Sequence, residues 1–319
     1  MYAMKLKPTF KDYLWGGEKL KRYWGKKTEI NPLAESWELS CHKDGNSIIT
    51  TGEYANSTLI DYIKAEGKDV LGSACERFSD FPILIKLIDA KENLSVQVHP
   101  DDEYALRVEG EMGKTEMWYI LDCTPDAKLF YGFKQEITKE ELKANIENNT
   151  LTDVLNEVPV KKGDVFFIKA GTVHAIGAGI LLAEIQQNSN TTYRVYDYGR
   201  VGADGQPRQL HIEKAMEVAT LTKPTVAQPD VPIEKDGYTF RLLSKCEYFT
   251  TVLIDVTESA TLQSTKKSFH SLLCIDGRLK IESEHGNMTI QKSDSVFLPA
   301  DYGEYKLVGE GKVIVTYEE

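Results

Sequence analysis

The chain contains no run of 18 apolar residues, so it offers no candidate for a membrane-spanning helix. Its N-terminus, MYAMKLKPTF, lacks the apolar core of a signal peptide. Cysteine is scarce, since the five cysteines are scattered and never form a CxxC pair. This usage is typical of reduced cysteines and argues against a structural zinc cluster. We therefore expect a cytoplasmic protein with no membrane partner.

Basic residues are in deficit. Lysine and arginine number 38 against 49 aspartates and glutamates, and the formal net charge is −11. Nucleic-acid-binding proteins carry basic faces, so this balance argues against a nucleic acid partner. A small anionic substrate stays compatible, because a few cations focused in a cleft can dominate the local potential. The 319 residues, 41% of them hydrophobic, suffice for two domains with apolar cores.

The most informative stretch is 162–200, KGDVFFIKAGTVHAIGAGILLAEIQQNSNTTYRVYDYGR. Its apolar run at 165–168 predicts a strand buried on both faces. Gly171 then permits a bend that a Cβ would forbid, and this bend delivers His174 to the start of the next strand.

A second strand is predicted at 180–187, where the two-residue period puts Leu182, Glu184 and Gln186 on one face. A carboxylate in so apolar a strand needs a partner, because burying it unpaired is very costly. Arg194 could be that partner in a purely structural ion pair, or it could serve a ligand.

Another strand, LSVQVHPDD, carries polar residues on one face. Ser95, Gln97 and His99 share that face, the two valines between them share the other, and Pro100 ends the strand. A Gln-x-His pair that points inward from a strand is unusual. Taken alone, it would be explained by a hydrogen-bonded core histidine.

Two further strands carry isolated charges. In GKTEMWYILD, Lys114 and Glu116 lie on a face that continues into Trp118, which indicates a polar cluster among apolar residues. In FPILIKLIDA, at 81–90, the only basic residue is Lys86, which extends to the edge of the sheet or serves a function.

Helical spacing of apolar residues is limited to a few segments. It predicts a helix at 58–66, two short helices within 134–158, and a helix at about 211–219. Thr138 with Glu141 forms the capping-box pattern that begins the second of these segments.

The last segment, about 233–319, is predicted to be rich in strands and to repeat part of the first half. SFHSLLCID aligns on TEMWYILD, so that His270 falls at the position of Glu116. KSDSVFLPADYGE aligns on KGDVFFIKAGTVH, so that Glu304 falls at the position of His174. These two residues alone would make a poor metal site.

The side chains His99, Glu116 and His174 together form a set that a mononuclear metal favours. Two imidazoles and a carboxylate suit zinc, and three protein ligands leave room for water or substrate. Gln97 is a candidate fourth ligand from the same strand face as His99. The same set would accept Fe(II) or Mn(II), because affinity alone does not select the metal.

These residues carry a resemblance to a known family. GDVFFIKAGTVHA resembles the second motif of the cupin superfamily. QVHPDD, GKTEMWYIL, AGTVHA and YRVYDYGR, in that order, resemble class I mannose-6-phosphate isomerases of the short bacterial form. The resemblance implies a mainly β fold of two cupin-type jelly-roll β-barrels. It implies a catalytic metal-binding domain at 1–228, with a small helical insertion at about 134–158, and a degenerate cupin-like domain at 229–319.

The resemblance also implies roles. Gln97, His99, Glu116 and His174 match the zinc ligands of the family, with one Zn²⁺ per chain and no organic cofactor. Arg194 matches its active-site arginine, and Lys114 and Glu184 match residues proposed for proton transfer. The implied reaction interconverts mannose 6-phosphate and fructose 6-phosphate, so the expected partner is a small sugar phosphate. Lys169 replaces the proline of the cupin turn.

The chemistry of this reaction is consistent with these residues. Aldose–ketose isomerisation moves a proton between C1 and C2 through a cis-enediol, and it requires a base and stabilisation of negative charge on oxygen. We expect burial to raise the pKa of Glu184 and the metal to lower that of Lys114, which slightly favours Glu184 as the base. Candidate phosphate-binding residues are Ser95, Lys86, Lys169 and Arg200.

Two other functions remain open from the sequence. One is a different metal cupin such as an Fe(II) dioxygenase, and the other is a non-catalytic module that binds sugar phosphates. The presence of Lys114 and Glu184 beside the candidate ligands argues against the second. The chain is expected to be a monomer or a homodimer.

Overall fold

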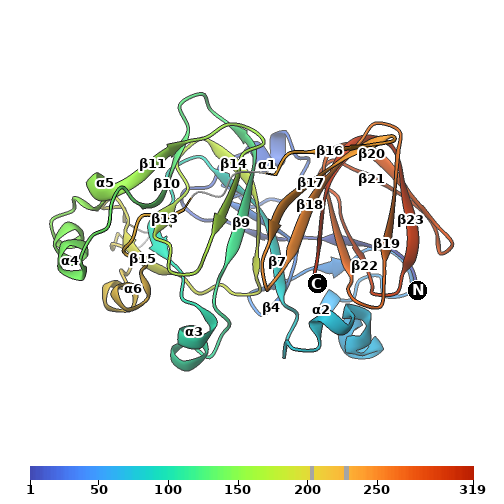
Figure 1. The fold of residues 1–319 in the computed structure, drawn as a ribbon, viewed down its shortest axis with the longest axis horizontal. Coiled ribbons are helices and arrows are strands. Elements are labelled where there is room, and N and C mark those ends of the chain that lie inside the picture. Colours follow the sequence, from blue (N-terminus) through green and yellow to red (C-terminus); the bar gives the residue numbers. More distant parts are fainter. Residues whose placement is uncertain (202–204, 226–229) are drawn as a thin grey trace.

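The computed structural model describes residues 1–201, 205–225 and 230–319, which fold mainly into β-strands (Figure 1). The prediction of a mainly β fold is confirmed. Three sheets lie in layers, and a group of helices covers the outer face of the first (Figure 1). No described helix has the length and apolar character that crossing a bilayer requires.

The middle layer is a six-stranded antiparallel sheet. Its strands, in spatial order, are β12 (Val165–Ile168), β9 (Glu116–Cys123), β14 (Ile180–Gln187), β7 (Ile83–Ala90), β3 (Glu35–Leu39) and β2 (Thr9–Lys11). All of these strands except the short edge strand β2 are rich in branched and aromatic apolar residues. Such residues favour strands, because their side chains pack well on a pleated surface.

The first layer is a five-stranded sheet that faces one side of the middle sheet. Its strands, in spatial order, are β11 (Leu155–Pro159), β10 (Lys128–Phe133), β13 (His174–Ala175), β8 (Val96–Val98) and β15 (Tyr193–Tyr196). Trp118 and Leu182 of the middle sheet pack with Leu129 and Tyr131 of this sheet in one apolar cluster. The polar residues predicted to face inward therefore lie between these two sheets.

The third layer is a ten-stranded sheet built mainly from the C-terminal part of the chain. Its main path runs β16 (Ile233–Lys235), β17 (Tyr238–Lys245), β18 (Thr250–Val256), β23 (Gly303–Tyr317), β20 (His270–Ser283), β22 (Ser295–Leu298), β1 (Met4–Lys7) and β6 (Ile48–Ile49). Two strands lie off this path, β19 (Ser259–Ser264) beside β23 and β21 (Gly286–Gln291) beside β20. A separate pair joins β4 (Cys41–His42) and β5 (Gly45–Asn46).

The middle sheet is buried on both faces. Met117 and Ile185 pack against Phe249 and Leu253 of the third layer, whereas Trp118 faces the five-stranded sheet. This alternation confirms the predicted faces of strands β9 and β14.

The predicted repeat has the same register in both halves. Glu116 of β9 lies opposite Ile168 of β12, and His270 of β20 lies opposite Leu298 of β22, as the alignment of the two segments requires. The predicted boundary at 228/229 lies outside the described residues.

The predicted helices form at α2 (Leu59–Glu66), α4 (Lys139–Glu147), α5 (Leu151–Val154) and α6 (Ile212–Val218). The capping box predicted at Thr138 and Glu141 is present. One correction concerns the end of the predicted helical segment, because residues 155–158 belong to strand β11. Leu155 aligns there with Phe133 of β10, so pairing at the sheet edge ends the helix.

Four short helical elements had not been predicted. They are α1 (Lys19–Arg22), α3 (Asp102–Val108) and the 3₁₀ turns Lys68–Leu71 and Ser73–Cys75. Asp101 caps α3 by accepting a hydrogen bond from the Tyr104 amide, which is the favoured role of an aspartate at this position.

Candidate active site and metal centre

The three predicted metal ligands meet between the first and middle sheets. His99 follows β8, Glu116 begins β9 and His174 begins β13, and their ligand atoms all lie within 4.8 Å of one another. All three side chains are buried. Antiparallel pairing of β13 with β8 places His174 opposite Gln97, and this pairing brings the two imidazoles together although 75 positions separate them in the chain.

Backbone carbonyls orient both histidine rings. The His99 Nδ1 lies 2.9 Å from the Thr191 carbonyl oxygen, and the His174 Nδ1 lies 2.8 Å from the Thr172 carbonyl oxygen. Because a carbonyl only accepts, each Nδ1 carries the proton and donates it. The Nε2 lone pair of each ring is therefore free to bind a cation inside the cluster.

The residues fit a divalent metal. The His99 Nε2 and the Glu116 Oε1 are buried and have no hydrogen-bond partner among the described residues. The His174 Nε2 lies 3.4 Å from the Glu116 Oε1, close to the roughly 3.3 Å edge of a tetrahedron with bonds of about 2.0 Å. Buried polar atoms without partners are costly, and one cation would satisfy them together.

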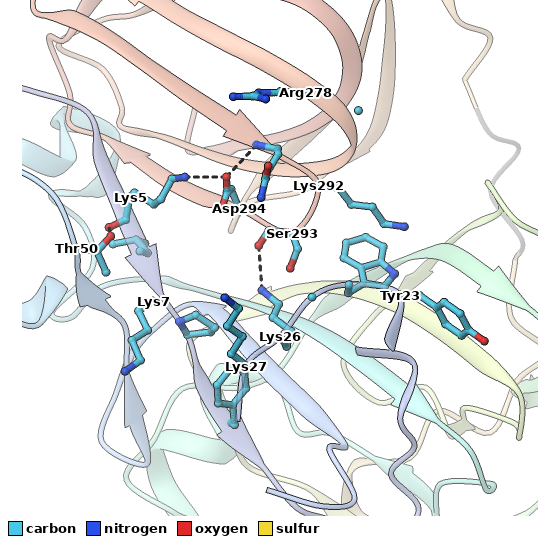
Figure 2. Close-up of a pocket in the computed structure, with 17 residues that line it drawn as sticks. Lys5, Lys7, Tyr23, Lys26, Lys27, Thr50, Arg278, Lys292, Ser293 and Asp294 are labelled. Atoms are coloured by element: carbon cyan, nitrogen blue, oxygen red, sulfur yellow. Dashed lines mark hydrogen bonds and ion pairs between the residues drawn. The ribbon is translucent and has the colours of Figure 1, made fainter. Parts of the chain in front are cut away.

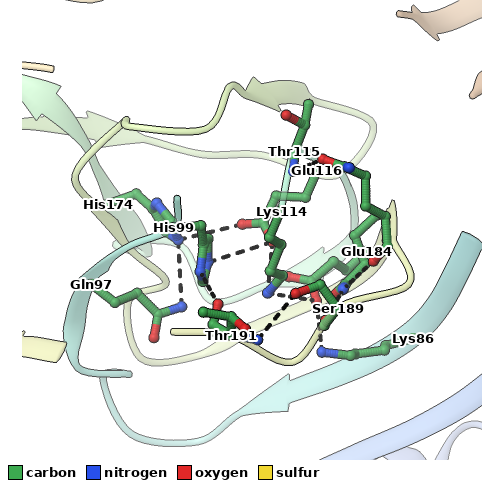
Figure 3. Close-up of polar contacts among 12 residues, drawn as sticks. Lys86, Gln97, His99, Lys114, Thr115, Glu116, His174, Glu184, Ser189 and Thr191 are labelled. Atoms are coloured by element: carbon green, nitrogen blue, oxygen red, sulfur yellow. Dashed lines mark hydrogen bonds and ion pairs between the residues drawn. The ribbon is translucent and has the colours of Figure 1, made fainter. Parts of the chain in front are cut away.

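Gln97 occupies the expected place beside this cluster. Its Nε2 lies 3.4 Å from the His174 Nε2, so the amide group is directed at the three ligands (Figure 3). An oxygen ligand from Gln97 requires the amide to be rotated, which exchanges the positions of its nitrogen and oxygen.

A cavity of about 260 Å³ lies next to the group formed by His99, Glu116 and His174, which we call the ligand cluster. Its lining residues include Ser95, Gln97, Lys86, Lys114, Glu184, Arg194, Arg208, Tyr13, Trp15, Glu35, Asn190 and Thr192. Gln97 and Lys114 both line this cavity and contact the cluster, so they connect the two. The predicted catalytic residues Arg194, Glu184 and Lys114 thus share one space.

Carboxylates and lysines alternate along one wall of the cavity (Figure 3). The Lys114 Nζ lies 2.9 Å from the Glu116 Oε2 and 3.7 Å from the Glu184 Oε1. The Lys86 Nζ in turn lies 3.2 Å from the Glu184 Oε1 and 3.9 Å from the Glu35 Oε2. Lys86 is therefore buried in an ion network rather than extended to the sheet edge.

The expected pKa shift of Glu184 was wrong in direction. Burial alone would raise its pKa, but Lys114 and Lys86, with a hydrogen bond from the Trp118 indole, outweigh burial and lower the pKa to about 2. The strand pattern around Glu184 showed its apolar neighbours, but it did not show that Lys86 of β7 and Lys114, just before β9, lie beside its carboxylate. The suggested ion pair with Arg194 does not form in the described residues, because Arg194 donates to Ser95 Oγ and the Gln209 carbonyl.

The charge states of the cluster suit cation binding. Burial lowers the pKa of His174 to about 4 and that of His99 well below its ordinary range, so both rings are neutral at pH 7. Burial is the main cause that raises the pKa of Glu116 to about 7, and repulsion by the nearby Glu184 carboxylate is the second. Protein groups therefore compensate the Glu116 carboxylate poorly, and a bound cation would stabilise its ionised form.

The phosphate candidates are divided between the cavity and the surface. Ser95 and Lys86 line the cavity, whereas Lys169 is exposed and lies outside its lining. Arg200 also lies outside that lining and is held by Asp197 and the Asn93 carbonyl. A phosphate role for Lys169 or Arg200 stays a prediction.

Sequence reasoning missed Arg208, which lines the cavity and binds Asp197 through two hydrogen bonds of 2.7 and 2.5 Å. It lies in an irregular segment, where no periodicity predicts which way a side chain points. Tyr13, Trp15 and Glu35 were missed for a different reason. They lie in the N-terminal segment and at the start of strand β3, and only tertiary packing brings them to the cavity.

Comparisons with known proteins show the family of the chain. Residues 3–119 match the family model "Phosphomannose isomerase type I, catalytic domain", and residues 239–318 match "Mannose-6-phosphate isomerase, cupin domain". The mannose-6-phosphate isomerase ManA of Bacillus subtilis is 39% identical over 98% of this chain and 97% of its own. The chain belongs to the mannose-6-phosphate isomerase family.

Other members of the mannose-6-phosphate isomerase family agree in length and fold. The Streptococcus mutans enzyme is 36% identical over 95% of this chain and 94% of its own. A Bacillus subtilis mannose 6-phosphate isomerase crystal structure matches 99% of both chains with a TM-score of 0.92 and 34% identity. The prediction of an aldose–ketose isomerase is confirmed at the level of this family.

Proposed function

We propose that this mannose-6-phosphate isomerase family member binds one Zn²⁺ per chain and interconverts mannose 6-phosphate and fructose 6-phosphate. His99, Glu116 and His174 would hold the ion, with Gln97 as a fourth ligand. The observation that carries this proposal is the set of buried, unpaired nitrogen and oxygen atoms beside a cavity lined by cationic side chains. The bound ion would polarise the C1 and C2 oxygens of the sugar.

Arg194 would stabilise the charge that develops during the reaction. Its guanidinium is held in the cavity lining by the Ser95 hydroxyl, 3.3 Å from Nε, and by the Gln209 carbonyl, 2.9 Å from Nη1. A cation fixed in this way needs little reorganisation when negative charge forms on the oxygens of a cis-enediol.

Lys114 and Glu184 would move the protons. Both line the cavity, and they are neighbours there, with 3.7 Å between Nζ and Oε1. We assign Glu184 to the proton on carbon and Lys114 to the hydroxyl proton. Since the Glu184 pKa is about 2, this role requires the sugar to weaken one of its two lysine contacts and so raise that pKa.

The phosphate group would be held by side chains of the cavity lining. Ser95 offers a hydroxyl donor and Lys86 a charged one, and Arg208 adds a guanidinium fork on the same cavity. The cytoplasmic location, the monomeric or homodimeric state and the division into domains at 1–228 and 229–319 stay predictions.

The proposal is tested with His99→Ala and His174→Ala. Each variant should lose stoichiometric zinc, measured by elemental analysis, and isomerase activity, measured in a coupled assay. The control is His285→Ala, because His285 lies outside the cavity and bonds the Tyr302 carbonyl; it should keep both. Stoichiometric zinc in either ligand variant contradicts the assignment. Bound iron together with oxygen uptake would support a dioxygenase. Binding of a sugar phosphate without turnover would support a binding module.

Arg194→Ala separates catalysis from metal binding. It should keep zinc and the fold but lose kcat by about 100-fold or more, the usual effect of removing a group that stabilises an oxyanion. Steady-state kinetics and elemental analysis on the same sample measure both. A change in KM at constant kcat would show that Arg194 acts in binding only.

A further inference from the structure

A second cavity, of about 600 Å³, lies where the N-terminal segment meets the ten-stranded sheet (Figure 2). It shares no lining residue with the cavity at the ligand cluster. We call it the cationic cleft, because six cationic side chains line it. These are Lys5, Lys7, Lys26, Lys27, Arg278 and Lys292. The single acidic residue among the lining residues is Asp294.

Half of these cations have a local partner. The Lys5 Nζ lies 2.8 Å from the Asp294 carboxylate. The buried Lys26 binds Glu38 at 2.6 Å and the Ser293 carbonyl at 3.0 Å, so it joins the two walls of the cleft (Figure 2). The Lys292 Nζ lies over the Trp24 ring, 4.8 Å from its centroid.

The other three cations are exposed side chains. Within residues 1–201, 205–225 and 230–319, the side chains of Lys7, Lys27 and Arg278 make no hydrogen bond or ion pair. Lys7 and Arg278 lie on strands β1 and β20 of the ten-stranded sheet, Lys27 lies in the loop after α1, and all three line the cleft (Figure 2). Such a gathering is unexpected in a chain with a net charge of −11, where acidic partners are plentiful.

A multivalent anion would neutralise this charge. Unpaired cations on one cleft repel one another, and at physiological salt this repulsion is screened over a distance of about 8 Å. A cleft lined by one sign of charge also raises the local concentration of ions of opposite sign. Lysine supplies point charges to phosphoryl oxygens, and arginine supplies a planar fork with several donors.

The size and the remaining lining restrict the ligand further. The volume lies within the range of roughly 300–1,000 Å³ found for small-molecule sites. Pro8, Phe10 and Tyr23 add apolar and aromatic surface beside the cations. We propose that the cationic cleft binds a small anion with two or more phosphoryl groups, at a site separate from the catalytic cavity.

Isothermal titration of the zinc-loaded, full-length protein with inorganic tripolyphosphate tests this proposal. We expect saturable binding to one site per chain, weaker at higher salt, and at least about tenfold weaker with inorganic phosphate, which has a single phosphoryl group. Tripolyphosphate should also raise Tm, because it binds only the folded chain. Tighter binding of a nucleoside diphosphate than of pyrophosphate would support a nucleotide as the occupant. Equal binding of the two would support an inorganic anion.

The matched variants are two triple substitutions that remove the same charge. Lys7→Ala, Lys27→Ala and Arg278→Ala together should weaken tripolyphosphate binding by at least about tenfold while isomerase activity stays unchanged. The control combines three exposed positions away from the cleft, Arg107→Ala, Lys139→Ala and Lys223→Ala, and should bind as the wild type does.

Three outcomes would overturn the proposal. They are the absence of saturable binding, equal weakening in both triple variants, and loss of binding in Arg194→Ala, which would place the anion in the catalytic cavity. A failed zinc or isomerase assay would leave this result interpretable, because the cleft contains neither the metal ligands nor the proposed catalytic residues.

Discussion

Lys86 shows at the level of one residue how burial changes the role of a charge. Its side chain is 4% exposed, and burial alone would lower its pKa, but Glu35 and Glu184 outweigh burial and raise it. The lysine therefore stays charged in the interior and compensates two carboxylates that line the cavity. Such a network is costly to break, because removing one partner leaves the others buried and unpaired.

We predict that Lys86→Met destabilises the protein by about 3 kcal/mol, measured by urea unfolding, because Glu184 and Glu35 lose a buried partner. The matched control is Lys128→Met, which breaks the exposed pair with Glu157 and should cost less than about 1 kcal/mol. Equal costs for the two substitutions would contradict a structural role for Lys86 in the cavity wall.

His270 carries a pH dependence that is separate from the ligand cluster. Burial lowers its pKa from the ordinary 6.5 to about 4, and its Nδ1 lies 2.8 Å from the Tyr305 hydroxyl. Between these pH values the unfolded chain binds a proton at this position and the folded chain does not. The stability that neutral His270 contributes is therefore present above pH 6.5 and is lost as the pH falls towards 4.

His270→Gln removes this titration. We predict that the unfolding free energy of the wild type, relative to this variant, falls by roughly 3 kcal/mol between pH 7 and pH 4. Urea unfolding of both proteins at a series of pH values measures the difference. A difference that is constant over this range would show that His270 titrates normally in the folded state.

At the scale of an element, the turn between β12 and β13 sets the position of His174, one of the proposed metal ligands. Gly171 has a φ of +87°, as the sequence predicted, and a Cβ there would lie 2.6 Å from Thr220 Oγ1. The next residue, Thr172, supplies the carbonyl that orients the His174 ring. The turn therefore needs glycine both for its backbone conformation and for its close packing.

We predict that Gly171→Ala destabilises the protein by about 2 kcal/mol and weakens zinc binding about tenfold, because Thr172 moves with the turn. The control is Gly67→Ala, where φ is +91° but no atom lies within 4 Å of the added Cβ. Gly67→Ala should lower the unfolding free energy through backbone strain alone and leave the zinc affinity unchanged. Equal zinc affinity in both variants, measured by competition with a chelator, would contradict the positioning role.

At the scale of the whole molecule, the middle sheet depends on both of its neighbours. One face packs on the five-stranded sheet and contributes the cavity wall, and the other packs on the ten-stranded sheet. Strand β1, at the N-terminus, also pairs with β22 of the ten-stranded sheet, so the two halves of the chain are interleaved (Figure 1). Among the described residues, the C-terminal part therefore supports the site without contributing to the group of His99, Glu116 and His174.

We predict that a fragment of residues 1–225 does not fold alone, because Met117, Ile185 and their neighbours would expose a face that the ten-stranded sheet covers. Near-UV circular dichroism and binding of an apolar dye should show a loss of fixed packing. Co-expression with residues 226–319 is the control and should restore the native signal. Cooperative unfolding of the fragment alone would contradict this dependence.

The sequence by itself determined those features that local pattern encodes. Period-two alternation assigned the faces of β8, β9 and β14, and the spacing of apolar residues located α2, α4 and α6. Residue chemistry selected His99, Glu116 and His174 as one set, because imidazole and carboxylate groups on inward faces have few other uses.

Only the tertiary structure decided the features that depend on distant segments. The pKa of Glu184 follows from Lys86 on β7 and from Lys114 just before β9, and Arg208 reaches the cavity from an irregular segment. Residues 155–158 form a strand because they pair with the edge of β10. The cationic cleft likewise joins lysines near the N-terminus to a turn some 270 positions later. Electrostatic interactions act through space, so sequence periodicity carries no record of them.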